Sequence, residues 1–338
     1  MSRRETRFSS SVLSVISLLV ASAGASAAPP APIYSNAGPT PTDPGLATGA
    51  TTRSGVAAPG GGLWSELQSD PTAGANAVAG FSNHSANPGG AYRFADDFTV
   101  TGTGFGWEIS SIDFFAYQTD AGSSSSPFAT LNVRIWNGRP GDVGRSVVWG
   151  DTVTNRLISS TPTNIYRTFS SDTVPSSGPI SSNRRVWMNT ASTPGLRLTP
   201  GVYWVDWQYT TVNPSLEAFT PAVTIVGARG KAGANARQLR VTDGVTLWAD
   251  LVDAGKPASA ADVGQDLPFI ITAAPAPGTC PGDADLNGIV TFNDLTTVLS
   301  NLGASYPQSS GPGDSNGDGT VSFSDVTITL VNFGITCS

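Results

Sequence analysis

Residues 130–138 read TLNVRIWNG, and this stretch decides the fold class of the chain. Leu131, Val133 and Ile135 alternate with Asn132 and Arg134. Successive side chains of a β-strand point to opposite faces, so this period of two predicts a half-buried strand. The Asn-Gly pair that closes the stretch predicts a turn.

The same pattern recurs between residues 63 and 272. Short apolar runs are separated by turn-forming clusters such as NGRPGD and TDG, and no long segment has helical periodicity. We therefore expect residues 63–272 to form one all-β antiparallel sandwich of jelly-roll type. Its expected strands lie at residues 92–100, 109–118, 130–138, 184–190, 201–210, 237–243, 245–251 and 267–273.

The segments on either side of this region differ from it in composition. Residues 28–62 are rich in Ala, Pro, Gly and Thr, which predicts an extended arm with little core of its own. Residues 273–279 read AAPAPGT, which predicts a linker to a last domain at residues 280–338.

The N-terminus has the features of a secretory signal peptide at residues 1–27. Arg3, Arg4 and Arg7 precede an apolar stretch at 11–23, and Ala-Ser-Ala at 25–27 fits a cleavage site. No later stretch approaches the roughly 20 apolar residues of a membrane span. We expect a secreted protein, extracellular or attached to the cell surface and not membrane-spanning; the paired arginines leave Sec and twin-arginine export both open.

Charge narrows the range of partners. The chain has 18 basic and 25 acidic residues, and cleavage of the signal peptide would leave 15 and 24, a net charge of −9. Residues 257–338 contain neither Lys nor Arg. Phosphate contacts need these cations, so nucleic acid is not an expected partner.

Two cysteines and one histidine limit the chemistry further. Cys280 and Cys337 are the only cysteines, and two cysteines in an oxidising compartment usually pair. We expect a disulfide between them; the alternative is two inert thiols. His84 is the only histidine, so a multi-histidine zinc site is impossible, and its surroundings, GFSNHSANPGG, indicate a loop.

A repeat occupies the C-terminal region. Residues 283–303 read DADLNGIVTFNDLTTVLSNLG, and residues 314–334 read DSNGDGTVSFSDVTITLVNFG, with an offset of 31 throughout. A fixed period indicates two copies of one supersecondary unit. After each loop, apolar residues such as Leu295, Val298, Leu299 and Leu302 stand at helical spacing, which predicts one helix per copy.

Each copy begins with the spacing of a calcium-binding loop. Oxygen-bearing side chains stand at positions 1, 3 and 5, Gly at 6, a backbone carbonyl at 7, a hydroxyl at 9 and a carboxylate at 12. Calcium prefers six to eight oxygen ligands, which this spacing can wrap around one point. The expected ligands of two Ca²⁺ ions are Asp283, Asp285, Asn287, Ile289, Thr291 and Asp294, and then Asp314, Asn316, Asp318, Thr320, Ser322 and Asp325.

No amphipathic helix precedes either loop, so each unit is one EF-hand-like loop with one exit helix. This pattern resembles the type I dockerin module over residues 280–338. The resemblance implies a cohesin-like or other cell-surface partner and a host that handles polysaccharide. It also implies ends that meet, where the Cys280–Cys337 disulfide would clasp them. Phe292 and Phe323 stand at a loop position where dockerins often carry Ser or Thr that select the cohesin; we expect both to pack the loop onto its helix instead.

Three functions remain open for the sandwich. It could bind carbohydrate through Trp136, Trp204 and Trp207, although these side chains could equally be core. It could be a passive surface or matrix component. It could be a glycoside hydrolase in polysaccharide catabolism, which needs two carboxylates across the scissile bond. The candidates are Glu66, Glu108, Glu217, Asp96, Asp97 and Asp206, of which the adjacent Asp96 and Asp97 would point to opposite faces of a strand. We expect a non-catalytic sandwich and keep the hydrolase as the alternative.

Overall fold

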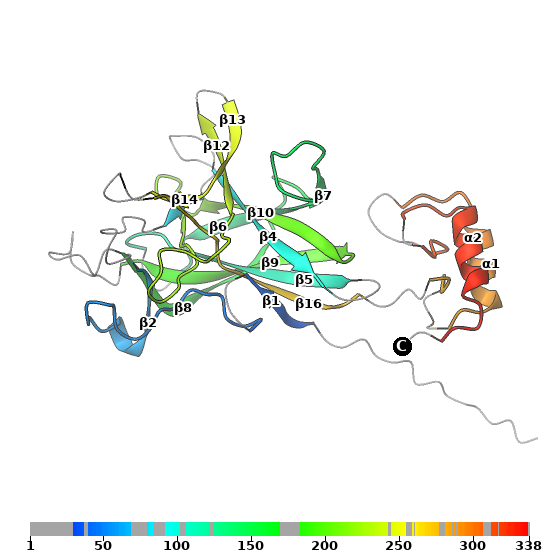
Figure 1. The fold of residues 1–338 in the computed structure, drawn as a ribbon, viewed down its shortest axis with the longest axis horizontal. Coiled ribbons are helices and arrows are strands. Elements are labelled where there is room, and N and C mark those ends of the chain that lie inside the picture. Colours follow the sequence, from blue (N-terminus) through cyan, green and yellow to red (C-terminus); the bar gives the residue numbers. More distant parts are fainter. Residues whose placement is uncertain are drawn as a thin grey trace, which may run out of the picture.

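The computed structural model shows a chain built mostly of β-strands in several sheets, with two short α-helices (Figure 1). The structure describes residues 30–36, 40–68, 80–83, 92–101, 106–121, 125–169, 183–242, 245–254, 259, 261–276, 281–285, 287, 289–306, 312–316 and 318–336. Neither α-helix among these residues is long and apolar enough to cross a membrane.

One six-stranded sheet, called the first sheet, has the order β1-β16-β5-β9-β8-β2. Its pairings are antiparallel except that β2 runs parallel to β8, which departs from the antiparallel sandwich expected. No tight hairpin joins β2 to β8, so no turn imposes an antiparallel direction on that pair. The strands are Ala31–Ser35 (β1), Leu63–Leu67 (β2), Trp107–Ala116 (β5), Leu157–Phe169 (β8), Arg185–Leu198 (β9) and Phe269–Pro275 (β16).

The other six-stranded sheet, called the second sheet, has the order β13-β12-β4-β10-β6-β7 and is antiparallel throughout. Its strands are Arg93–Val100 (β4), Phe128–Trp136 (β6), Val147–Gly150 (β7), Gly201–Thr211 (β10), Arg237–Thr242 (β12) and Val245–Asp250 (β13). Two short pairs complete the sheets: β3 (Phe81–Ser82) with β11 (Phe219–Thr220), and β14 (Val252–Asp253) with β15 (Val263–Gly264).

Side chains of both sheets form one apolar core. The rings of Phe114 on β5 and Trp207 on β10 have centroids 4.7 Å apart, and those of Phe98 on β4 and Phe269 on β16 are 6.4 Å apart. Leu131, Val133 and Ile135 on β6 are buried in this core, as their alternation predicted. The mostly β fold is thereby confirmed, and the jelly-roll type stays a prediction.

The segment before β2 covers part of the outer face of the first sheet. Leu46 has no exposed surface and packs with Phe115, Val186 and Ile270, whose neighbours Phe114 and Ile271 point into the main core. A 3₁₀ turn at Pro59–Gly61 follows before β2. Together with the pairing of β1 and β16, these contacts show that the segment predicted as an arm with little core of its own, residues 28–62, packs against the core of the sheets.

Each of the eight strands expected from the sequence is present, seven of them within two residues of the predicted bounds, whereas β9 continues eight residues beyond the end predicted at 190. Strands β1, β2, β7 and β8 were not predicted, and neither were the two-residue strands β3, β11, β14 and β15. At the C-terminal end, β16 continues to Pro275, so residues 273–275 of the expected linker at 273–279 belong to the first sheet. Beyond the sheets, the α-helices are α1 (Phe292–Ser300) and α2 (Phe323–Val331), one after each calcium-type loop.

Candidate metal centre

The two repeats begin their helices in the same way. Thr291 caps α1 and Ser322 caps α2, each accepting a hydrogen bond from a backbone N–H of the first turn. In return, Asp294 Oδ2 accepts from Thr291 N at 2.7 Å and Asp325 Oδ2 accepts from Ser322 N at 2.8 Å. These reciprocal capping boxes fix the last carboxylate of each loop in place.

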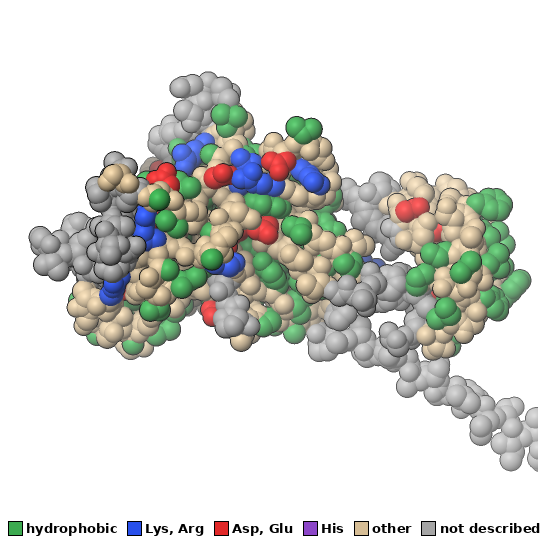
Figure 2. Space-filling view, viewed as in Figure 1, with side chains coloured by type: hydrophobic (Ala, Val, Ile, Leu, Met, Phe, Trp, Pro, Cys, Tyr) green, Lys and Arg blue, Asp and Glu red, His purple; other side chains and the backbone are tan. Residues whose placement is uncertain are grey.

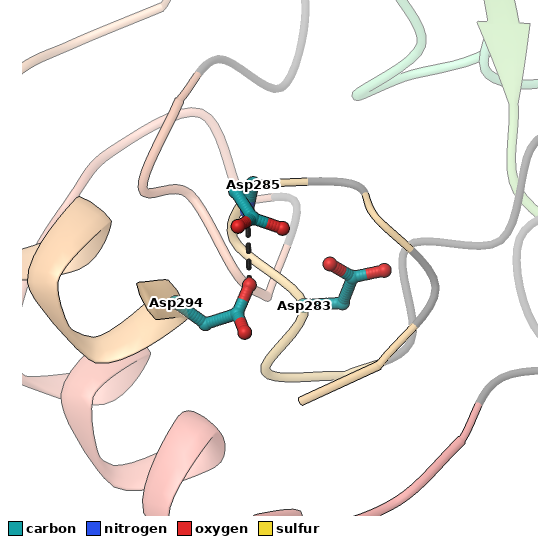
Figure 3. Close-up of side chains that lie close together, drawn as sticks. All are labelled: Asp283, Asp285 and Asp294. Atoms are coloured by element: carbon teal, nitrogen blue, oxygen red, sulfur yellow. Dashed lines mark hydrogen bonds between the residues drawn. The ribbon is translucent and has the colours of Figure 1, made fainter. Parts of the chain in front are cut away.

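Three carboxylates converge in the first loop (Figure 3). Asp283 and Asp285 come from the loop and Asp294 from the first turn of α1, and one ligand oxygen of each lies within 4.8 Å of the other two. Asp294 Oδ1 also accepts from Asp285 N at 3.0 Å. Burial raises the pKa of Asp294, but the hydrogen bonds from Thr291 and Asp285 outweigh it and leave that pKa below its ordinary value. Three oxygen-donor groups at one point fit a hard cation such as Ca²⁺.

The second loop has the same backbone contacts but a different side-chain arrangement. Asp314 Oδ1 accepts from Asp318 N at 3.1 Å, as Asp283 Oδ1 accepts from Asn287 N at 3.0 Å. The carboxylate of Asp318, however, is turned toward Asn316 Nδ2 and Thr320 Oγ1, at 2.9 and 2.7 Å. Of the acidic residues in the described part of the chain, only the first-loop triad converges within 4.8 Å.

The loop of each repeat forms a β-bridge with the segment that follows the helix of the other repeat. Ile289 of the first loop bridges Thr336, which follows α2, and Thr320 of the second loop bridges Ser305, which follows α1. Because 289 and 320, and also 305 and 336, differ by 31 residues, the two bridges are equivalent under the repeat. Each loop is therefore held by the segment that follows the helix of the other copy.

Equivalent glycines bring the two copies into close contact. Gly282 and Gly313 have φ of +100° and +92°, a region that glycine tolerates at no steric cost. A Cβ at Gly282 would lie 2.8 Å from Thr329 Cα, and one at Gly313 would lie 3.0 Å from Asn301 Cβ. The backbone before each loop thus lies directly against the helix region of the other copy.

The helices bury a narrower face than the spacing predicted. Val298 and its equivalent Thr329 are buried, whereas Leu299 and Leu302 are exposed. Phe292 and Phe323 are 68% and 77% exposed, so the expectation that they pack the loop onto its helix is wrong. Their place at the first position of each helix points the rings into solvent.

The three tryptophans expected to contact carbohydrate differ in their exposure to solvent. Trp207 is 0% exposed in the main core and Trp204 is 4% exposed, so neither offers a ring face to a sugar, and both predictions are corrected. Trp136 is half-buried. Its Nε1 donates to Asp206 Oδ2 at 3.0 Å, and the Arg134 guanidinium lies 5.1 Å from its ring centroid.

Two arginines hold Asp206 on the outer face of the second sheet. Asp206 Oδ1 lies 2.6 Å from Arg93 Nε, and Oδ2 lies 2.5 Å from Arg134 Nη2. Arg93 also donates to Asn132 and Gln208. Neither arginine was predicted as a site residue; the alternation of Arg134 with apolar residues showed its face but not its partner. With these contacts, Asp206 is a fixed counterion of Arg93 and Arg134.

The other catalytic candidates each have their own partners. Asp96 is buried and accepts from Asn36 Nδ2, Leu267 N and Asp97 N at 2.8–2.9 Å; burial, and then Asp266, raise its pKa well above the ordinary value. Asp97 is half-exposed on the opposite strand face, as expected. Glu66 is buried and accepts from Arg53 N, Glu108 pairs with Arg197 at 3.2 Å, and Glu217 lies just before β11.

Some predictions fall outside the described residues. These are the signal peptide at 1–27, His84, and both Cys280 and Cys337 with their expected disulfide. No protein-family model matches this chain, and neither a curated protein nor a solved structure matches it.

Proposed function

We propose that this is a secreted protein attached through residues 280–338, a calcium-binding, dockerin-like module, to a cohesin-type or other cell-surface partner. Its β fold binds carbohydrate and does not catalyse. The observation that carries the proposal is the interlocked pair of loop-helix repeats, in which ligand spacing, capping and bridges all recur after 31 residues. Two independent turns rich in Asp would have no reason to share this arrangement.

Calcium supplies a positive charge at each loop. The side chains of Asp283, Asp285 and Asp294 would hold one ion, and those of Asp314, Asn316, Asp318 and Asp325 the other, with the remaining ligands as given above. Without a cation, three carboxylates within 4.8 Å repel one another. The module therefore folds with its metal, and a Cys280–Cys337 disulfide would add a covalent link between its ends.

An exposed apolar surface supports the attachment role. Figure 2 shows hydrophobic side chains gathered over the two helices. The exposed members recur with the repeat: Phe292, Leu299 and Leu302 on one copy, and Phe323, Leu330 and Phe333 on the other. Contiguous apolar side chains on a small unit are typical of protein-binding surfaces.

A direct binding experiment tests the attachment. The full chain is passed over immobilised cohesin modules in calcium and then in EGTA, with surface plasmon resonance as the readout. Binding in calcium that is lost in EGTA is expected, and it should also be lost in the double variant Asp294→Asn/Asp325→Asn. The control Asp142→Asn removes a carboxylate from the β fold and should bind normally. Binding that persists in EGTA contradicts the calcium-dependent attachment, and no binding to any cohesin contradicts the cohesin-type partner.

A further inference from the structure

The second sheet carries Arg93, Arg134 and Arg237 on its outer face, together with the half-buried rings of Trp136 and Trp248. Arg139 and Arg145 come from the loop that follows β6, where Arg145 donates to the carbonyl oxygen of Asn137, and the five arginines are here called the arginine face. Arg134 on β6 lies opposite Asp206 on β10, and Arg237 on β12 lies opposite Ala95 on β4. Their strand neighbours Val133, Ile135 and Val205 point into the core, which places these arginines on the far side of the sheet.

The loop between β6 and β7 extends this face toward β12 and β13. Arg139 bonds Asp250, and Arg237 donates to the carbonyl oxygens of Pro140 and Trp248. The rings of Trp136 and Trp248 meet edge to face with centroids 6.4 Å apart. Figure 2 shows basic and acidic side chains in a row along this side of the β fold.

The arginine face is rich in cations although the protein has a net charge of −7. Four of its arginines form ion pairs with three carboxylates, those of Asp142, Asp206 and Asp250. Arg93 is 4% exposed, and its Nη2 has no hydrogen-bond partner among the described residues. Burial lowers the pKa of this guanidinium, so a further anion nearby is electrostatically favourable.

We infer that the arginine face binds a carboxylate-bearing polysaccharide. Guanidinium groups bind carboxylates with two parallel hydrogen bonds, and the flat rings of Trp136 and Trp248 offer apolar surface to the sugar units between the acidic groups. The inference rests on the proposed carbohydrate-binding role. It places the carbohydrate site at the arginine face instead of at Trp204 and Trp207, which are buried. It also specifies that the bound polysaccharide carries carboxylate groups.

Affinity gel electrophoresis of the full chain tests this with polygalacturonate and with fully methyl-esterified polygalacturonate, which has the same backbone but no charge. We expect retardation by the acid form alone, weakening as salt is added. The double variant Arg139→Ala/Arg145→Ala should bind about tenfold more weakly, which corresponds to about 1.4 kcal/mol. Its matched control is Arg197→Ala, because Arg139 and Arg197 are both 37% exposed and both form ion pairs with exposed carboxylates.

Four outcomes overturn the inference. Equal binding of the two galacturonate polymers, or an arginine double variant that binds like Arg197→Ala, would leave the carbohydrate-binding role intact and remove the arginine face from it. Equally tight binding of dextran sulfate would show a general attraction for polyanions instead of a carboxylate site. Binding to no polysaccharide would end both this inference and the carbohydrate-binding part of the proposed function, while the cohesin experiment would be unaffected.

Discussion

At the scale of single residues, Asp206 shows what strand periodicity can and cannot reveal. Alternation in YWVDWQY places Asp206 on the face opposite Val205 and Trp207, and the structure agrees. Its partners Arg93 and Arg134 lie 113 and 72 positions away in the chain. They meet only because β10 pairs with both β4 and β6, and a register between distant strands is not written in any local pattern.

The same contacts predict a large effect of Asp206→Asn. The amide keeps the shape of the side chain but removes its charge, which leaves the nearly buried Arg93 uncompensated, and Arg134 beside it. Breaking a buried ion pair on one side costs about 3–5 kcal/mol, so the free energy of unfolding of the β fold should fall by about that amount. Urea denaturation followed by tryptophan fluorescence measures it.

The control for this prediction is Asp250→Asn. Asp250 pairs with Arg139 and Arg237 but its side chain is 62% exposed, and exposed pairs contribute at most about 1 kcal/mol. Equal losses in the two variants would mean that Asp206 is not the buried counterion described above.

At the scale of elements, the two loop-helix repeats could be predicted because their signal is local. Ligand spacing, the glycine at position 6 and the exit helix all lie within one short segment. It was harder to predict which face of each helix is buried, because the contacts between the two copies determine it. Gly282 packs against Thr329, so a polar residue is buried while Leu330 beside it is exposed.

The N-terminal segment is the opposite case, because its composition conceals its packing. One leucine among Pro, Gly, Thr and Ala has no periodicity to reveal it, yet Leu46 fills the site formed by Phe115, Val186 and Ile270. Leu46→Ala should lower the free energy of unfolding by about 2–5 kcal/mol through lost burial and the cavity left behind. Thermal and urea denaturation provide the measurement.

Leu63→Ala is the matched change for Leu46→Ala. Leu63 opens the next strand and is 39% exposed, so the same loss of atoms should cost less than half as much. If the two variants proved equally stable, residues 40–62 would not be a packed part of the β fold.

At the scale of the whole molecule, the strand order lies beyond sequence reasoning. Neighbours in each sheet are mostly far apart in the chain; β10, for example, lies between β4 and β6. Strand β8 was missed because its residues, LISSTPTNIYRTF, are largely polar and include a proline. Such a strand is recognised only through its partners, β9 and β2.

In the full chain, calcium should raise the thermal stability of the C-terminal module at residues 280–338 and not that of the β fold. The described residues hold a convergent acidic triad in 283–294, so a ligand that binds only the folded module stabilises that module by mass action. Calorimetry of the full chain should show two unfolding transitions. In EGTA, the midpoint temperature of the transition in which helical circular dichroism at about 222 nm is lost should fall by about 10 °C or more, and that of the β transition should not move.

The double variant Asp294→Asn/Asp325→Asn should be insensitive to EGTA, whereas Asp142→Asn should respond as the parent does. A β transition that moves equally in EGTA would mean that calcium acts on the sheets, and the C-terminal repeats would then not be the calcium-dependent part of the molecule.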